Sequence, residues 1–243
     1  MKTADKELRT IIIQKKTNLI LSLDVTDKLH FFSVLYDCKE YICAVKLHLD
    51  CYTFMDDKAY DTLFDWAEKY NFIIIEDRKF ADIGNTNRLQ ALRFMNIGIR
   101  YFTSHIFMGK DSIENFPENC CVFLIANMSC KGSYFSDKIQ LEPLLESTSK
   151  SYYDKIPNVI GFVSQKNIET NSEKYPLILR PGVRLPGSHN NDTMGQIYKP
   201  PEIYPGVCWV VGREIIHAKE PKKVAEKYKN IFTSNFETWN QSI

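Results

Sequence analysis

The 243-residue sequence has no excess of charge of either sign. Lys and Arg together number 31 and Asp and Glu number 30, so the formal net charge is +1 and the isoelectric point is near 7.6. A strong basic excess is typical of proteins that bind nucleic acid or membrane surfaces, and acidic blocks are typical of disordered tails. We therefore expect no nucleic-acid partner.

Long apolar segments are also missing. No run approaches the roughly 20 apolar residues that cross a bilayer, and the charged N-terminus holds apolar patches too short for a signal sequence. We expect a cytoplasmic protein with no membrane partner. No low-complexity linker divides the chain, so we expect one domain over residues 1–243.

Spacings that hold metals or disulfides are absent as well. The seven cysteines are odd in number and no two form a Cys-x-x-Cys pair, which favours free thiols in a reducing compartment. His, Asp and Glu show no metal-ligand spacing, and nothing resembles a cofactor motif. We expect a protein without metal or cofactor.

What the sequence does contain is a repeated pattern of short apolar runs, rich in Ile, Val and Phe. Their residues are 18–25, 42–49, 72–76, 100–104, 121–128, 159–164, 177–183 and 207–212. Runs that are apolar on both faces suit parallel strands covered by helices, and residues 57–69, 87–95 and 220–228 have helical spacing. Eight strands alternating with helices predict a (β/α)8 barrel. An open doubly wound sheet is the alternative, although no G-x-G-x-x-G follows the first run.

Charged residues stand at the ends of the first three runs. Asp24 ends the first, Lys46 and His48 end the second, and Asp77 and Lys79 end the third. In a barrel these ends meet at one rim, where barrel enzymes hold their catalytic residues. Residues two apart on a strand share a face, so Lys46 should point with His48, and Asp77 with Lys79.

Lysines and aspartates that alternate in space keep one another charged. This arrangement disfavours a Schiff-base lysine, which must be neutral to attack, and favours a fixed electrostatic field. One carboxylate would repel a substrate anion, and one ammonium would receive the negative charge that replaces it. The loss of CO2 with delivery of a proton fits such a site.

Two motifs carry a family resemblance. DRKFADIGNT at residues 77–86 and AVKLHLD at 44–50 resemble those of the orotidine 5′-phosphate decarboxylase family, and LSLDV, MSCKGS, RPGV, GQIY and VVGR occur in the family's order. The similarity covers essentially the whole chain. It implies a stand-alone, metal-free enzyme that converts orotidine 5′-phosphate to UMP in pyrimidine nucleotide synthesis.

The resemblance also implies roles for particular residues. The catalytic network would be Lys46, Asp77, Lys79 and Asp82, with Lys79 as the proton donor to C6 of the pyrimidine. Substrate would be bound at the ribose by Asp24 and Lys46 with His48 and Thr86 close by, at the base by Ser129, between base and phosphate by Gln196, and at the phosphate by Tyr198, Gly212 and Arg213. A homodimer is implied in which Asp82 and Thr86 reach into the neighbour's site.

Some features depart from this pattern or leave alternatives open. Asn127, Arg180 and Ile197 replace residues common in the family, and Arg180 could contact phosphate or point outward. Residues 184–193 are polar and contain a Pro-Gly pair, which predicts a mobile lid over the phosphate. Two other functions stay open: a metal-dependent sugar-phosphate decarboxylase or aldolase on the same barrel, and a catalytically silent nucleotide-binding barrel.

Overall fold

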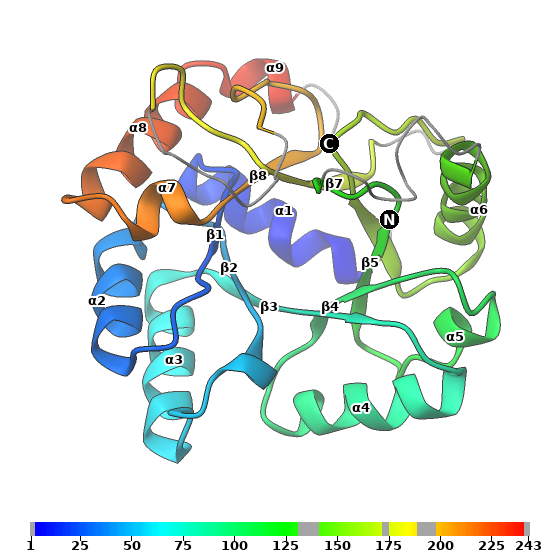
Figure 1. Ribbon diagram of the computed structural model, residues 1–243. Helices are drawn as coiled ribbons and strands as arrows, with labels where there is room; N and C mark the ends of the chain where they lie inside the picture. The colour runs from blue at the N-terminus through cyan, green and yellow to red at the C-terminus, as the bar shows by residue number, and fades with distance from the viewer. Residues whose placement is uncertain (1–2, 131–140, 172–174, 189–197, 241–243) are drawn as a thin grey trace.

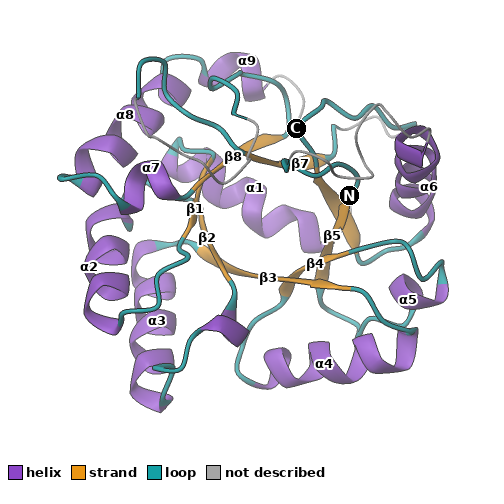
Figure 2. Ribbon diagram, in the orientation of Figure 1, coloured by secondary structure: helices purple, strands orange, loops and turns teal. Residues whose placement is uncertain are grey.

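The computed structural model describes residues 3–130, 141–171, 175–188 and 198–240. Its core strands are β1 (Leu19–Ser22), β2 (Ala44–Leu47), β3 (Ile73–Phe80), β4 (Tyr101–Ser104), β5 (Cys121–Ile125), β6 (Val159–Val163), β7 (Leu177–Pro181) and β8 (Val207–Val211). Each pairs in parallel with the next, and β8 pairs with β1 (Figures 1 and 2). The predicted (β/α)8 barrel is confirmed, and the closing pair excludes an open doubly wound sheet.

Helices surround the ring of strands (Figure 2). They are α2 (Lys28–Cys38), α3 (Asp57–Tyr70), α4 (Gly84–Asn96), α5 (Asp111–Glu114), α6 (Leu141–Lys155), α7 (Arg213–Ile216), α8 (Pro221–Thr233) and α9 (Phe236–Asn240), with a 3-10 turn η1 (Leu49–Cys51) after β2. The helices predicted at 57–69, 87–95 and 220–228 correspond to α3, α4 and α8. The strands are buried on both faces because one face fills the barrel and the other packs under helices.

The first helix, α1 (Thr3–Lys15), lies across one end of the barrel (Figure 1). Glu7 accepts a hydrogen bond of 2.6 Å from the hydroxyl of Tyr101, where β4 begins. Arg9 donates to the backbone oxygen of Tyr175, two residues before β7, at 2.5 Å. These contacts show that α1 covers the end at which the strands begin, so the opposite end holds their carboxyl termini.

Strand β3 is irregular where its charged residues lie. Its pairing with β4 shifts register between Glu76 and Phe80, and Lys79 has a left-handed φ of 51°. A residue with a Cβ is strained in that region by about 1 kcal/mol or more. The N–H of Lys79 donates to the hydroxyl of Thr103 in β4 at 3.1 Å. The simple alternation expected from the sequence therefore does not set the direction of Lys79.

The structure bears on two expectations from the composition, which concern membrane spans and the state of the cysteines. Within the described ranges, no helix is both long and apolar enough to span a membrane. All seven cysteines are free thiols, as their spacing predicted. Cys51 and Cys130 are exposed and the other five are buried.

Candidate active site

A cavity of about 530 Å³ lies at the carboxyl end of the barrel. Its wall is charged along β1 to β3 and mainly apolar along β6 to β8, where valines and a leucine line it. Small-molecule sites commonly combine such a volume with a few polar groups on an apolar wall. The predicted site residues that line it are Asp24, Lys46, His48, Asp77, Lys79, Ser129, Tyr198, Gly212 and Arg213.

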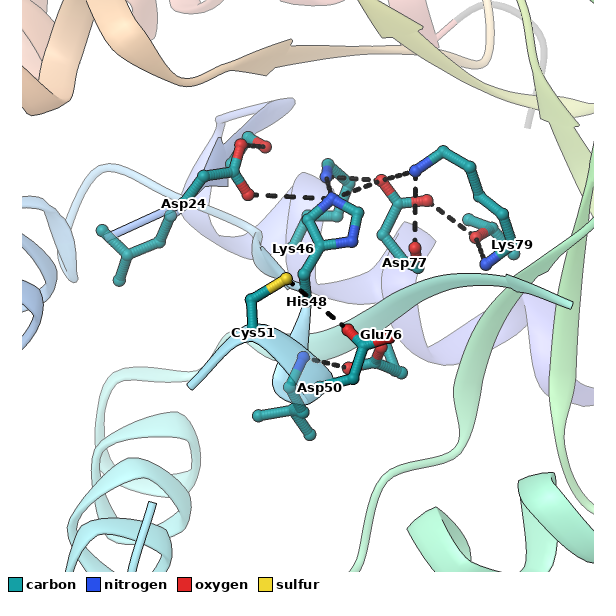
Figure 3. A network of polar contacts seen from close by, with 12 residues as sticks. Asp24, Lys46, His48, Asp50, Cys51, Glu76, Asp77 and Lys79 are labelled. Carbon is teal, nitrogen blue, oxygen red and sulfur yellow. Dashed lines mark hydrogen bonds and ion pairs between the residues drawn. The ribbon is translucent and has the colours of Figure 1, made fainter. Parts of the chain in front are cut away.

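Asp77 is the centre of the charged wall (Figure 3). Its Oδ2 accepts from Nζ of Lys46 at 2.5 Å and lies 2.9 Å from Nζ of Lys79, while its Oδ1 accepts from the hydroxyl of Thr103 at 2.7 Å. Burial acts to raise the pKa of Asp77, but the two ammonium groups outweigh it and hold the pKa below its usual range. The carboxylate is therefore ionised at neutral pH.

Lys46 is also buried, and it is tied to the same carboxylate. Burial acts to lower the pKa of Lys46, but the attraction of Asp77 and of Asp24 raises it above the ordinary value. Lys46 therefore stays protonated beside an ionised Asp77. This pair has the mutual charge stabilisation that the alternating residues predicted.

His48 joins the cluster from outside its strand. It follows β2 and caps η1, yet its Nε2 lies 3.3 Å from Nζ of Lys46, 3.4 Å from Oδ2 of Asp77 and 3.7 Å from Oδ1 of Asp24. Burial and then the charge of Lys46 lower the pKa of His48, so the ring is neutral at neutral pH. A neutral ring can accept from the ammonium at Nε2. Ser22 completes the group by donating to Asp24 at 3.1 Å.

The other end of the cavity is lined by two arginines, Arg184 and Arg213, and by Tyr198. Arg213 begins α7 one residue after β8 ends. A Cβ on the intervening Gly212 would lie 3.0 Å from the backbone oxygen of Ser22, a tight contact that favours glycine there. The guanidinium carbons of Arg184 and Arg213 lie 3.5 Å and 6.0 Å from the centre of the Tyr198 ring. The buried Tyr198 hydroxyl has no hydrogen-bond partner in the structure as described. Donors of this kind can bind a phosphate group.

Two predicted site residues do not line this cavity. Asp82 is exposed in the loop after β3, where its Oδ1 accepts from the N–H of Ile83 at 2.7 Å and its own N–H donates to Asn87 at 3.2 Å. Thr86 lies in the first turn of α4 and is partly exposed. Gln196 falls outside the described residues, as do Ile197 and the 189–193 part of the predicted lid.

Arg180 points away from the cavity. Its buried guanidinium donates to Glu202 at 2.9 Å and also contacts the side chain of Asn167. It does not add a cation to the mouth of the barrel, which answers the question that the sequence left open. Asn127, the other departure among the described residues, does line the cavity.

The sequence reasoning missed residues that support this site from neighbouring elements. Thr103 of β4 orients Asp77, and Arg184 lies over Tyr198. Glu214 lines the cavity and accepts from the backbone N–H of Leu185 at 3.2 Å. The only local signals for Thr103 and Arg184 were weak: a hydroxyl side chain near the end of β4 and an arginine directly after the RPGV motif. The part of the chain that the structure describes contains no cluster of three His, Cys, Asp or Glu suited to a metal.

Comparisons with known proteins agree on one family. Residues 17–228 match the Orotidine 5′-phosphate decarboxylase / HUMPS family. The chain is 31% identical to orotidine 5′-phosphate decarboxylase of Saccharomycopsis fibuligera, over 92% of this chain and 89% of that protein. It is 30% identical to uridine 5′-monophosphate synthase of Naegleria gruberi over 93% of this chain, but spans 48% of that longer protein. The crystal structure of orotidine 5′-phosphate decarboxylase from Pyrococcus horikoshii OT3 superposes with a TM-score of 0.63 at 25% identity, covering 88% of this chain and 98% of that one.

Proposed function

This chain belongs to the orotidine 5′-phosphate decarboxylase family, and from that premise we propose how its barrel converts orotidine 5′-phosphate to UMP in pyrimidine nucleotide synthesis. The observation that carries the proposal is the buried Asp77 carboxylate, held between Lys46 and Lys79 in the wall of a nucleotide-sized cavity. A carboxylate fixed there repels the carboxylate of the substrate. That repulsion ends when CO2 leaves, so it favours the transition state over the bound substrate.

Lys79 is the proposed proton donor. As the bond to CO2 breaks, its electron pair stays on C6 of the pyrimidine, and a proton from Nζ of Lys79 converts that carbon to the C–H of UMP. The side chain of Lys79 is 28% exposed and that of Lys46 is 10% exposed, which supports Lys79 as the group that meets the substrate. The neutral amine left behind regains its proton from water.

The remaining groups hold the two ends of the nucleotide. An arginine fork and the Tyr198 hydroxyl, which has no hydrogen-bond partner among the described residues, suit the phosphate. The polar group around Asp24 suits ribose hydroxyls. The proposed assignments are Asp24, Lys46 and His48 for the ribose, Ser129 for the base, Gln196 between base and phosphate, and Tyr198, Gly212 and Arg213 for the phosphate.

A homodimer with shared sites is part of the proposal. Asp82 does not line the cavity of its own barrel, and exposed apolar side chains lie at the start of α4, on α4 and on the loop leading to α5. They are Ile83 at 60%, Leu89 at 60%, Phe107 at 46% and Met108 at 51%. The elements that carry them are joined, because the N–H of Gly84 donates to Asp111 at 2.8 Å, and exposed apolar groups on adjoining elements can form a protein contact. A two-fold contact at this rim would let each subunit lend Asp82 and Thr86 to the other.

The test is turnover by the purified protein after treatment with EDTA and dialysis. The fall in absorbance as orotidine 5′-phosphate becomes UMP should proceed at the rate of untreated protein, because the proposed chemistry uses protein side chains alone. Activity that required added Mg²⁺ would favour the sugar-phosphate branch of the family. A folded protein that binds UMP without turnover would favour a catalytically silent barrel.

A further inference from the structure

Glu76 is a fully buried carboxyl group directly before Asp77 in β3. The two side chains leave opposite faces of the strand, and Glu76 does not line the cavity (Figure 3). Its Oε2 accepts a hydrogen bond of 3.0 Å from the backbone N–H of Leu49. Its Oε1 has no hydrogen-bond partner among the residues described. Glu76 therefore lies behind the charged cluster and contacts the backbone that carries it.

The bonded backbone is the turn at the end of β2. Leu47 is the last residue of β2 and pairs in register with Glu76, and Leu49 begins η1 two residues later. Lys46 and His48 flank Leu47 on either side. The hydrogen bond from Leu49 thus holds the turn that directly follows Lys46 and His48, the two residues of this segment whose side chains contact Asp77.

We propose that Glu76 is a positioning residue for the decarboxylation: its buried carboxyl holds the turn after β2 and, through that turn, keeps Lys46 and His48 against Asp77. It contacts neither the substrate nor the reacting atoms. The inference rests on the proposed function, because it explains the placement of a lysine and a histidine to which that function assigns roles.

The charge state of Glu76 supports this role. Burial is the largest cause that raises the pKa of Glu76 to about 8, and the negative charges of Asp50 and Asp77 also raise it. The hydrogen bond from the N–H of Leu49 and the positive charge of Lys46 act in the opposite direction. The titratable and charged groups around it are Lys46 of β2, Asp50 and Cys51 of η1, Tyr52, Tyr60 of α3 and Asp77 of β3, with Arg93 of α4 beside Tyr60. A neutral acid can hold Leu49 without adding a second anion beside Asp77. Ionised, it would compete with Asp77 for Lys46.

This charge state has a defined effect on stability. The pKa of Glu76 in the folded protein, about 8, lies above its ordinary value of 4.5, so the folded state binds more protons than the unfolded state between those pH values. The contribution of Glu76 to the free energy of unfolding therefore falls as pH rises through that window and stays low above it. Glutamine keeps an acceptor oxygen for Leu49 but does not titrate. Glu76→Gln should therefore melt at a higher temperature than wild type at pH 9 and much closer to it at pH 5.

The test compares Glu76→Gln and Glu76→Leu with wild type. For wild type, kcat should fall above a midpoint near pH 8, where Glu76 ionises. Glu76→Gln should keep kcat within about twofold at neutral pH, and its alkaline fall should move to higher pH. Glu76→Leu removes the acceptor, so its kcat at neutral pH should drop by roughly tenfold or more while the melt stays cooperative. The exposed Glu226 of α8 supplies the control: Glu226→Gln should keep the wild-type profile.

Infrared difference spectra test the same inference without activity. Wild type should show the carbonyl stretch of a protonated carboxylic acid, lost with a midpoint near pH 8 and absent from Glu76→Gln. An alkaline fall unchanged in Glu76→Gln, or wild-type kcat in Glu76→Leu, would overturn the positioning role. If Glu76→Leu does not fold, the pH profile of Glu76→Gln still decides the question. Wild-type protein that shows the infrared signal but no turnover would instead contradict the proposed function.

Discussion

Three side chains from β2, β3 and β4 converge on the Asp77 carboxylate. Lys46 comes from β2, Thr103 from β4 and Lys79 from its own strand, and each lies within 2.9 Å of a carboxylate oxygen of Asp77. Because the carboxylate is buried, removal of any partner leaves a charge or a donor without its counterpart. Substitutions within this group are therefore expected to be non-additive. Individual contributions are best read from changes in kcat and in product binding taken together.

Lys79→Ala separates these two quantities. The substitution removes the proposed proton donor and the positive charge that balances the departing carboxylate, so kcat should fall by roughly a hundredfold or more. Binding of UMP, measured by calorimetry, should change little because the product no longer carries that carboxylate. Arg78→Ala is the matched control, since Arg78 is a neighbouring cation whose side chain is 41% exposed. A Lys79→Ala kcat within about tenfold of wild type would show that another group is the acid.

Strands β3 and β6 show how whole elements depart from ideal geometry. In β3 the register shift and the left-handed Lys79 carry the charged residues beyond the regular ladder. In β6, Gly161 faces the next strand so closely that a Cβ would lie 2.0 Å from the backbone oxygen of Leu177. Neither side of that contact is a flexible side chain. Closure of the barrel at β6 and β7 therefore requires glycine at this position.

Gly161→Ala should consequently destabilise the barrel. Backbone must move to relieve the contact, so we expect the free energy of unfolding to drop by about 3 kcal/mol or more in urea titrations. Gly109→Ala is a useful comparison, because its Cβ would meet nothing within 4 Å but its φ is +81°. That variant should lose about 1 kcal/mol from backbone strain alone. Equal losses for the two variants would argue against a steric requirement at Gly161.

At the scale of the whole molecule, the barrel gathers one set of charges in its cavity and leaves another at its rim. The charged wall is built by β1 to β3 and the residues that follow β1 and β2, whereas Asp82 and the exposed apolar side chains lie outside on the loop after β3, on α4 and before α5. A single barrel therefore places Asp77 and Asp82 in different surroundings, although only four residues lie between them in the sequence. The shared-site homodimer is the proposal that returns Asp82 to a cavity.

Mixed dimers of Lys79→Ala and Asp82→Ala test that proposal. Each variant refolded alone should be inactive, because every site then lacks one required group. If Asp82 acts in the neighbouring subunit, a mixed dimer holds one site with both defects and one native site. Random pairing makes half of the dimers mixed, so roughly a quarter of all sites should recover activity. A mixture that stays inactive would show that Asp82 serves its own barrel.

The sequence by itself determined the architecture and the composition of the charged cluster. Parallel strands buried on both faces require continuous apolar runs, and such runs are visible without any tertiary information. Because parallel strands end at one rim, residues in or just after their carboxyl-terminal halves, such as Asp24, Lys46 and Asp77, are predictable as neighbours. Contiguous motifs were enough to indicate the family.

The tertiary structure alone decided how individual side chains are directed and what surrounds them. Lys79 reaches Asp77 from a left-handed position at a register shift, which no period-two pattern contains. Thr103 and Arg184 matter through contacts with residues far away in the sequence. Arg180 turns outward because Glu202 pairs with it, and Glu76 is buried because β3 is covered on its outer face. Local patterns set which face of an element is apolar, whereas charge pairing and burial depend on segments that meet when the barrel closes.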